Sequence, residues 1–212
     1  MLRPMDIRLA TPADVDPATE TITGAFSTDP VWEVALRRPD GRVDHHLAYW
    51  RRFVAAAQVQ DAVWLLDGGA AVAVWVPPDG RELPDEALAE LDRFNAETLG
   101  AVGAAEMDEL YARFDANHPA GPPHAYLSLL ATHPEHRGKG VGQQLLAANL
   151  RHWDALGVPA YLESTNPAND HRYERAGFRR VGGFRAVRDG APITTMWRDP
   201  AGPSVPGGRP DR

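Results

Sequence analysis

One segment of the chain, Ala131 to Gln144, reads ATHPEHRGKGVGQQ and joins two stretches of different periodicity. Residues 124–131 before it have the aromatic and leucine-rich composition of a strand, whereas residues 141–156 carry apolar side chains at helical spacing. The predicted order is therefore strand, glycine-rich turn and helix. Three glycines at alternate positions leave room for backbone N–H groups to converge, and the first N–H groups of a helix have no partners. The turn therefore predicts a cradle for a phosphate or pyrophosphate.

Lys139 lies inside this turn and is the only lysine in the sequence, whose other basic Lys/Arg residues are all arginines. A compact ammonium group suits a point contact with phosphate. The nucleotide P-loop motif does not fit, because His133 stands where that motif needs glycine and Gly140 where it needs Ser or Thr. A dinucleotide-binding fingerprint fits better, since Gly140-x-Gly142 opens the helix and Glu163 follows at a suitable distance to hold a ribose. Its third small residue, however, is replaced by Leu145.

Two motifs resemble those of a known superfamily. Residues 137–142, RGKGVG, fit Arg-x-x-Gly-x-Gly, and residues 169–178, NDHRYERAGF, fit Asn-x-x-x-Tyr-Glu-x-x-Gly-Phe. In this order and spacing they resemble the two signatures of the GNAT acetyltransferases, the first of which holds the pyrophosphate of acetyl-CoA. A wider likeness, from residues 7–11 through 69–75 to Phe178, is similar to the puromycin N-acetyltransferases within that superfamily.

The resemblance implies the fold. We expect one α/β (α+β) domain over residues 1–199, with a central, mostly antiparallel sheet that splits at the coenzyme site and has helices on both faces. The length of 212 residues suits a single domain. Residues 200–212 are rich in Gly and Pro and predict a disordered tail.

The remaining elements follow from local signals. A capping pattern at Thr11-Pro12-Ala13-Asp14 predicts a helix to about Phe26, and Asn166-Pro167 predicts the start of another that ends before Gly177. Within 84–117, Gly100 and Gly103 are expected to divide a long helical pattern into two helices. Further predictions are strands at 6–10, 63–66, 70–76 and 161–165, a short helix from Asp29, a helix around Trp50, and a final hairpin turning at Asp189-Gly190.

Composition limits the partners and the compartment. The net charge of −7 and a pI near 5.6 argue against nucleic-acid binding and favour cationic small substrates. The chain has no cysteine, no signal-like start and no long apolar run, so we expect a cytoplasmic protein without membrane contact. No histidine pair has the His-x-x-x-His spacing of a helical metal site, and we expect no metal.

The resemblance also implies roles for individual residues. Tyr173 is the expected acid that protonates the departing thiolate, and Glu163 is either a base, a substrate contact or a structural residue. A backbone N–H of the central strand is placed to stabilise the oxyanion. The residues expected to bind acetyl-CoA are Leu130, Ala131, Thr132, Arg137, Gly138, Lys139, Gly140, Val141, Gly142, Gln143 and Asn169.

The expected activity is transfer of an acetyl group from acetyl-CoA to a primary amine of a small molecule. An aminonucleoside or another amino antibiotic is the first expectation for the acceptor, with antibiotic resistance as the corresponding role. Three alternatives stay open: a catalytically silent acyl-CoA-binding sensor, an enzyme acting on a protein or peptide amine, and a dinucleotide-binding protein. The oligomeric state, monomer or homodimer, is left open as well.

Overall fold

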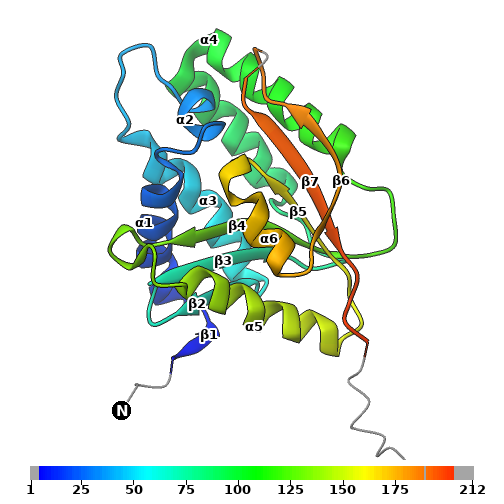
Figure 1. The fold of residues 1–212 in the computed structure, drawn as a ribbon. Helices are drawn as coiled ribbons and strands as arrows, with labels where there is room; N and C mark the ends of the chain where they lie inside the picture. The colour runs from blue at the N-terminus through cyan, green and yellow to red at the C-terminus, as the bar shows by residue number, and fades with distance from the viewer. Residues whose placement is uncertain (1–4, 189, 203–212) are drawn as a thin grey trace, which may run out of the picture.

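The structure is a computed structural model that describes residues 5–188 and 190–202 (Figure 1). The predicted turn residue Asp189 and residues 203–212 of the predicted tail lie outside this part of the chain. Helices lie on both faces of a central sheet, as the sequence predicted.

The sheet has seven strands within the described residues, in the order β1-β2-β3-β4-β5-β7-β6. Neighbouring strands are antiparallel except for β4 and β5, which are parallel, so the predicted mostly antiparallel sheet is confirmed. The strands are β1 (Ile7–Leu9), β2 (Val63–Leu66), β3 (Ala71–Val76), β4 (Ala125–Thr132), β5 (Ala160–Ser164), β6 (Arg179–Arg185) and β7 (Pro192–Arg198).

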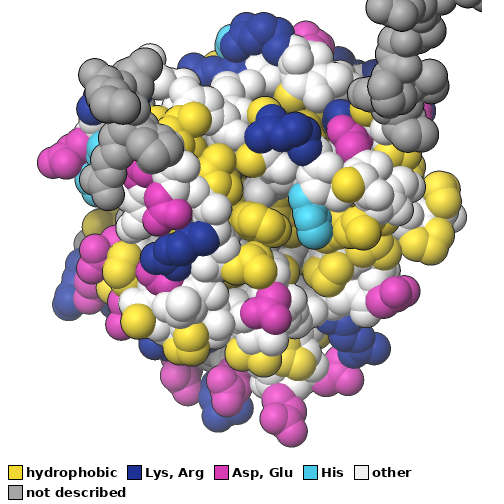
Figure 2. Space-filling model, turned by 90° about the horizontal axis from the view of Figure 1, so that it is seen from below, with side chains coloured by type: hydrophobic (Ala, Val, Ile, Leu, Met, Phe, Trp, Pro, Cys, Tyr) yellow, Lys and Arg dark blue, Asp and Glu magenta, His cyan; other side chains and the backbone are white. Residues whose placement is uncertain are grey.

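The helices form two layers, each with its own apolar core. Helices α1 (Val15–Phe26), α2 (Trp32–Ala35), α3 (His45–Val59) and α4 (Asp85–Asn117) pack on one face. The other face carries α5 (Val141–Ala155), with α6 (Asp170–Arg175) beside it. Within the described residues, no helix is both long and apolar enough to cross a membrane. At the end of the molecule where α5, β1 and β2 lie, hydrophobic side chains reach the surface between acidic and basic ones (Figure 2).

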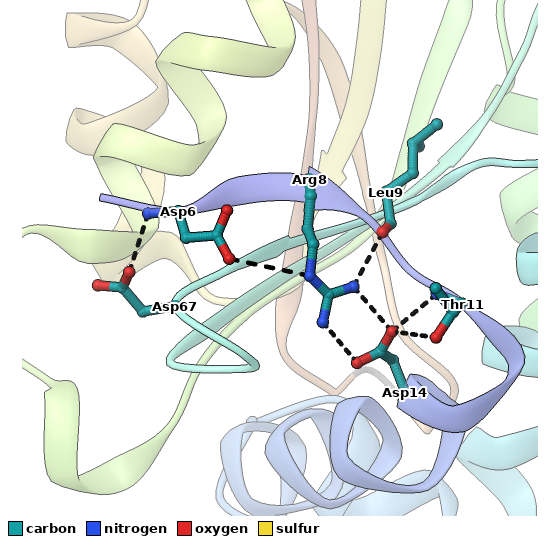
Figure 3. A network of polar contacts seen from close by, with 6 residues as sticks. All are labelled: Asp6, Arg8, Leu9, Thr11, Asp14 and Asp67. Carbon is teal, nitrogen blue, oxygen red and sulfur yellow. Dashed lines mark hydrogen bonds and ion pairs between the residues drawn. The ribbon is translucent and has the colours of Figure 1, made fainter. Parts of the chain in front are cut away.

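An ion-pair network fixes the start of α1 (Figure 3). The guanidinium of Arg8 on β1 donates to both carboxylate oxygens of Asp14, at 2.8 and 2.7 Å, and the backbone N–H of Thr11 donates to the same carboxylate at 2.7 Å. The capping pattern read from the sequence is therefore present. The hydrogen bonds from Arg8 and Thr11 hold the pKa of Asp14 well below its usual range.

Helix α4 bends at one glycine. Gly100 has a φ of +73°, a left-handed conformation that breaks the helix, so the predicted division there is confirmed. The predicted break at Gly103 is wrong, because the helix continues through that residue. A Cβ at position 103 would lie 2.7 Å from the Cβ of Leu99, so this glycine permits a close approach between successive turns.

Candidate active site

The site begins where β4 and β5 separate. These parallel strands pair only at Ala125 with Ala160 and at Tyr126 with Tyr161. Beyond Tyr126, the edge of β4 that faces β5 has no strand partner among the described residues. The split that the sequence predicted in the sheet therefore lies at this point, and it leaves unpaired backbone groups at the edge of a gap.

A bulge lies at the same point of β4. Its other neighbour, β3, pairs Trp75 with Leu127 and Val74 with Leu129, so Ser128 is skipped. In a regular strand the side chains of residues 127 and 129 would point to the same face, but the extra residue of a bulge places them on opposite faces. Leu127 accordingly packs in the core under α5, whereas Leu129 packs in the core under α1 and α3.

A single cavity of about 580 Å³ runs through this split. One end is lined by residues of the loop before α5 and by the start of α6. The other end is lined by residues of α2, α3, the loop before α4 and the C-terminal end of α4. A cavity of this size suits a ligand of drug-like dimensions.

The first end has the geometry of an anion cradle. Gly138 and Gly140 have φ values of +77° and +75°, and Gly140 is the N-cap of α5. The first helical hydrogen bond of α5 runs from the N–H of Gln144 to the carbonyl of Gly140 at 3.1 Å, so the three N–H groups from 141 to 143 precede it. These features fit the pyrophosphate of a coenzyme.

Gly142 allows α5 to approach β4 closely. A Cβ at this position would lie 2.6 Å from the Oγ1 of Thr132. The start of α5 is therefore held against the strand edge that lines the cavity.

Most of the residues predicted to contact coenzyme or substrate come together around this cavity. Ala131 and Lys139 do not line it: the side chain of Ala131 is 2% exposed and packs in the core, and Lys139 is exposed outside the cavity. The predicted residues that line the cavity are Leu130, Thr132, Arg137, Gly138, Gly140, Val141, Gly142, Gln143, Glu163, Asn169 and Tyr173.

Tyr173 comes from α6, and Asn169 is the N-cap residue just before that helix. The ring of Tyr173 packs edge-on against Phe178 at a centroid distance of 6.2 Å. Burial, with the nearby charge of Asp29, raises the pKa of Tyr173 to about 12, so its phenol is protonated at neutral pH and can donate a proton. The Oδ1 of Asn169 accepts a hydrogen bond from Arg172 at 2.8 Å.

Glu163 projects from β5 with a side chain that is only 2% exposed. Its Oε1 lies 3.7 Å from the Nδ1 of His118, and its Oε2 is buried without a hydrogen-bond partner among the described residues. A buried, unpartnered carboxylate oxygen is costly unless a ligand satisfies it.

Sequence reasoning missed a second carboxylate, Glu82. It lies in the loop between β3 and α4, lines the same cavity and accepts a hydrogen bond from the hydroxyl of Ser128. Burial raises the pKa of Glu82 to about 7. The sequence offered no signal, because a glutamate in the segment PPDGRELPDE has the pattern of a solvent-exposed loop.

Charge is segregated along the cavity. The arginines that line it, Arg137, Arg172 and Arg175, all come from the cradle and α6. Of the acidic residues that line the cavity, Glu82, Asp115 and Glu163 lie close together toward the other end, whereas Asp29 accepts a hydrogen bond from Thr165 and lies near Tyr173.

Aromatic rings form the wall around this acidic end. Trp32 stacks on Phe114 at a centroid distance of 6.1 Å, with an interplanar angle of 7°. The hydroxyl groups of Tyr49 and Tyr111 are hydrogen-bonded to each other beside them. The cavity thus joins a cationic cradle to an acidic, aromatic compartment.

Comparison with known proteins agrees with this geometry. The model of the acetyltransferase (GNAT) family matches residues 70–178, which is just over half of the chain. A mycothiol acetyltransferase of Propionibacterium freudenreichii is 44% identical over 64 residues, which cover 29% of this chain and 20% of that protein. The match thus spans about a fifth of that relative's length.

Solved structures share the whole fold. A Corynebacterium glutamicum structure described as histone acetyltransferase HPA2 and related acetyltransferase is 26% identical, with a TM-score of 0.64 over 95% of this chain and 99% of that one. Arylalkylamine N-acetyltransferase 2 of Aedes aegypti is 12% identical, with a TM-score of 0.67 over 94% of this chain and 100% of that one.

Proposed function

This chain belongs to the acetyltransferase (GNAT) family, and we propose that it transfers the acetyl group of acetyl-CoA to a primary amine of a small molecule. The observation that carries the proposal is the segregation of charge along one cavity. An anionic coenzyme suits the arginine-lined cradle, and an ammonium group suits the carboxylates at the other end. The split between β4 and β5 lies between these two ends, where the thioester would meet the amine.

The residues supply the groups that this reaction needs. The N–H groups at the start of α5 bind the pyrophosphate, and the unpaired edge of β4 orients the pantetheine arm and stabilises the oxyanion. Tyr173, protonated at neutral pH, gives its proton to the sulfur as the C–S bond breaks. The aromatic wall excludes water from the thioester.

The acceptor compartment suits an amine on an aromatic or heterocyclic body. Aromatic side chains such as Trp32, Trp50 and Phe114 bind flat rings by stacking. An aminonucleoside or another amino antibiotic combines such a ring with a primary amine. The aromatic wall therefore supports it as the first acceptor to test.

The test measures release of free thiol from acetyl-CoA with a panel of amines: puromycin, 2-phenylethylamine, spermidine and a short lysine-containing peptide. We expect release with at least one small amine and tighter binding of acetyl-CoA than of NAD. Binding of acetyl-CoA without thiol release from any amine would contradict the proposal and favour an acyl-CoA sensor. Release with the peptide alone would favour a protein-modifying enzyme.

A further inference from the structure

Deepening the function proposed above, on which this inference rests, we propose that Glu82 binds the ammonium form of the acceptor and removes its proton, with Ser128 holding the carboxylate and Glu163 facing the same ammonium from β5. This assigns a catalytic residue outside both sequence motifs of the family.

The position of Glu82 follows from the bulge in β4. Ser128 has no paired residue on β3, and it lies two residues after Tyr126, the last residue of β4 that pairs with β5. Its hydroxyl donates to the carboxylate of Glu82, a residue of the loop before α4. The bulge and the loop together therefore place Glu82 at the point where the sheet splits, which is where the acetyl group and the amine must meet.

Among the described residues, no lysine or arginine forms an ion pair with Glu82. The charge of His118 lowers the pKa of Glu82, but burial outweighs that effect. The charged and titratable groups around it are Glu163, Asp115, His118, Tyr49, Tyr111 and Tyr126, from β5, α4 and the loop after it, α3 and β4.

Two carboxylates that face one cavity repel each other, and a shared cation relieves that repulsion. Burial of an unpaired carboxylate is costly as well, because it removes the charge from water. The ammonium group of an amine supplies the missing charge.

The protonation behaviour of Glu82 suits this role. Burial, opposed by the hydrogen bond from Ser128 and reinforced by the charge of Glu163, raises its pKa to about 7. A general base works best when its pKa lies near the working pH. An alkylamine with a pKa of about 10.4 is only about one part in a thousand neutral at pH 7, so the reaction needs such a base.

The protons balance as follows. Glu82 takes one proton from the ammonium group and later loses it to solvent. The neutral amine attacks the thioester carbon, and the C–S electron pair leaves on sulfur, which takes the proton of Tyr173. The nitrogen that now carries the acetyl group gives its extra proton to the Tyr173 phenolate. The products are the amide, CoA thiol and one proton.

The experiment compares wild type, Glu82→Gln and Glu86→Gln with the amine of the panel that wild type acetylates fastest. The Glu82→Gln variant keeps the shape and can still accept the hydrogen bond from Ser128. Glu86→Gln is the matched control, because it makes the same change at an exposed residue four positions away that does not line the cavity. The measurement is kcat/KM from pH 6 to 9, with melting temperature and acetyl-CoA affinity determined for each protein.

We expect kcat/KM of Glu82→Gln to fall by about 10²–10⁴ at pH 7, with acetyl-CoA affinity within about twofold of wild type. The kcat/KM of wild type should reach a plateau above pH 7, whereas the Glu82→Gln variant can use only amine that is already neutral. The ratio of wild-type to variant kcat/KM should therefore fall by about tenfold for each pH unit above 7. Glu86→Gln should keep the wild-type profile.

A deficit that stays constant across pH, or a wild-type rate, would overturn the inference while leaving the proposed function intact. Should Glu82→Gln fold poorly, Ser128→Ala provides the second test, because it keeps the carboxylate and removes its hydrogen bond. Loss of that bond should move the midpoint of the profile to higher pH, and an unchanged midpoint would contradict the assignment. A wild-type protein that releases no thiol with any amine would overturn the proposed function, and this inference with it.

Discussion

Gly142→Ala is the sharpest test of the coenzyme cradle. The new Cβ would lie 2.6 Å from the Oγ1 of Thr132, whereas ordinary contacts begin at about 3.4 Å. Thr132 is β-branched, so its χ1 rotation is restricted and its side chain cannot easily move aside. The start of α5 must therefore move about 0.8 Å away from β4.

A shift of this size changes the hydrogen bonds that the cradle can make. A contact of about 2.9 Å between N–H and phosphate oxygen would lengthen to about 3.7 Å, beyond the range of a hydrogen bond. Each such bond to a charged group contributes about 1.5–3 kcal/mol. We expect the Kd for acetyl-CoA to rise by about 10–100-fold in titration calorimetry, with unfolding stability lower by about 1–3 kcal/mol.

Two further variants separate this mechanism from general damage. Gly24→Ala is the control, because a Cβ there would meet only the side chain of Pro134, at 3.4 Å, and its affinity should stay within about twofold of wild type. Thr132→Ala removes the obstructing oxygen, so the Thr132→Ala/Gly142→Ala double variant should recover most of the lost affinity. Wild-type affinity in Gly142→Ala alone, or no recovery in the double variant, would refute the reasoning.

Three other variants test separate parts of the molecule. Tyr173→Phe should lower the single-turnover rate by about tenfold to a thousandfold with little change in acetyl-CoA affinity, and a wild-type rate would remove Tyr173 from the mechanism. Lys139 is exposed and does not line the cavity, so Lys139→Ala should weaken CoA by several-fold only at low salt, through loss of a nearby positive charge, and should leave a pantetheine analogue without pyrophosphate unaffected. A loss that is independent of salt would contradict this reasoning. Asp14→Asn should lower the free energy of unfolding by about 1 kcal/mol at pH 7 in urea titrations. Because the folded pKa of Asp14 is depressed, that difference should persist above about pH 4 and disappear as the pH falls further, and a difference independent of pH would contradict it.

The central part of the fold could be predicted from the sequence because its signals are local. The strand, the glycine-rich turn and the helix around residues 124–156 each carry their own periodicity or backbone requirement. Gly100 illustrates the limit of such signals. It and Gly103 are both glycines in one helical pattern, but only Gly100 adopts a left-handed conformation, whereas Gly103 lies within the helix close to Leu99.

The acceptor side of the site could not be read from the sequence. Residues 127–131, LSLLA, suit a regular strand, and nothing in them marks Ser128 as the residue that β3 skips. Glu82 lies 46 positions before Ser128, so only the folded chain reveals that the two are hydrogen-bonded. Lys139 shows the converse, because its residue type suits phosphate binding but the residue is exposed and does not line the cavity.

The two ends of the cavity come from different parts of the chain. The cradle is built from residues 136–143 and the start of α6, whereas the stretch between β3 and β4 contributes Glu82, Tyr111, Phe114, Asp115 and His118 to the other end. Substitutions, or even changes of length, in that one stretch can therefore reshape this part of the acidic compartment while the cradle keeps its geometry. Because residues 77–124 contribute nothing to the cradle, the two ends of the cavity can change independently of each other.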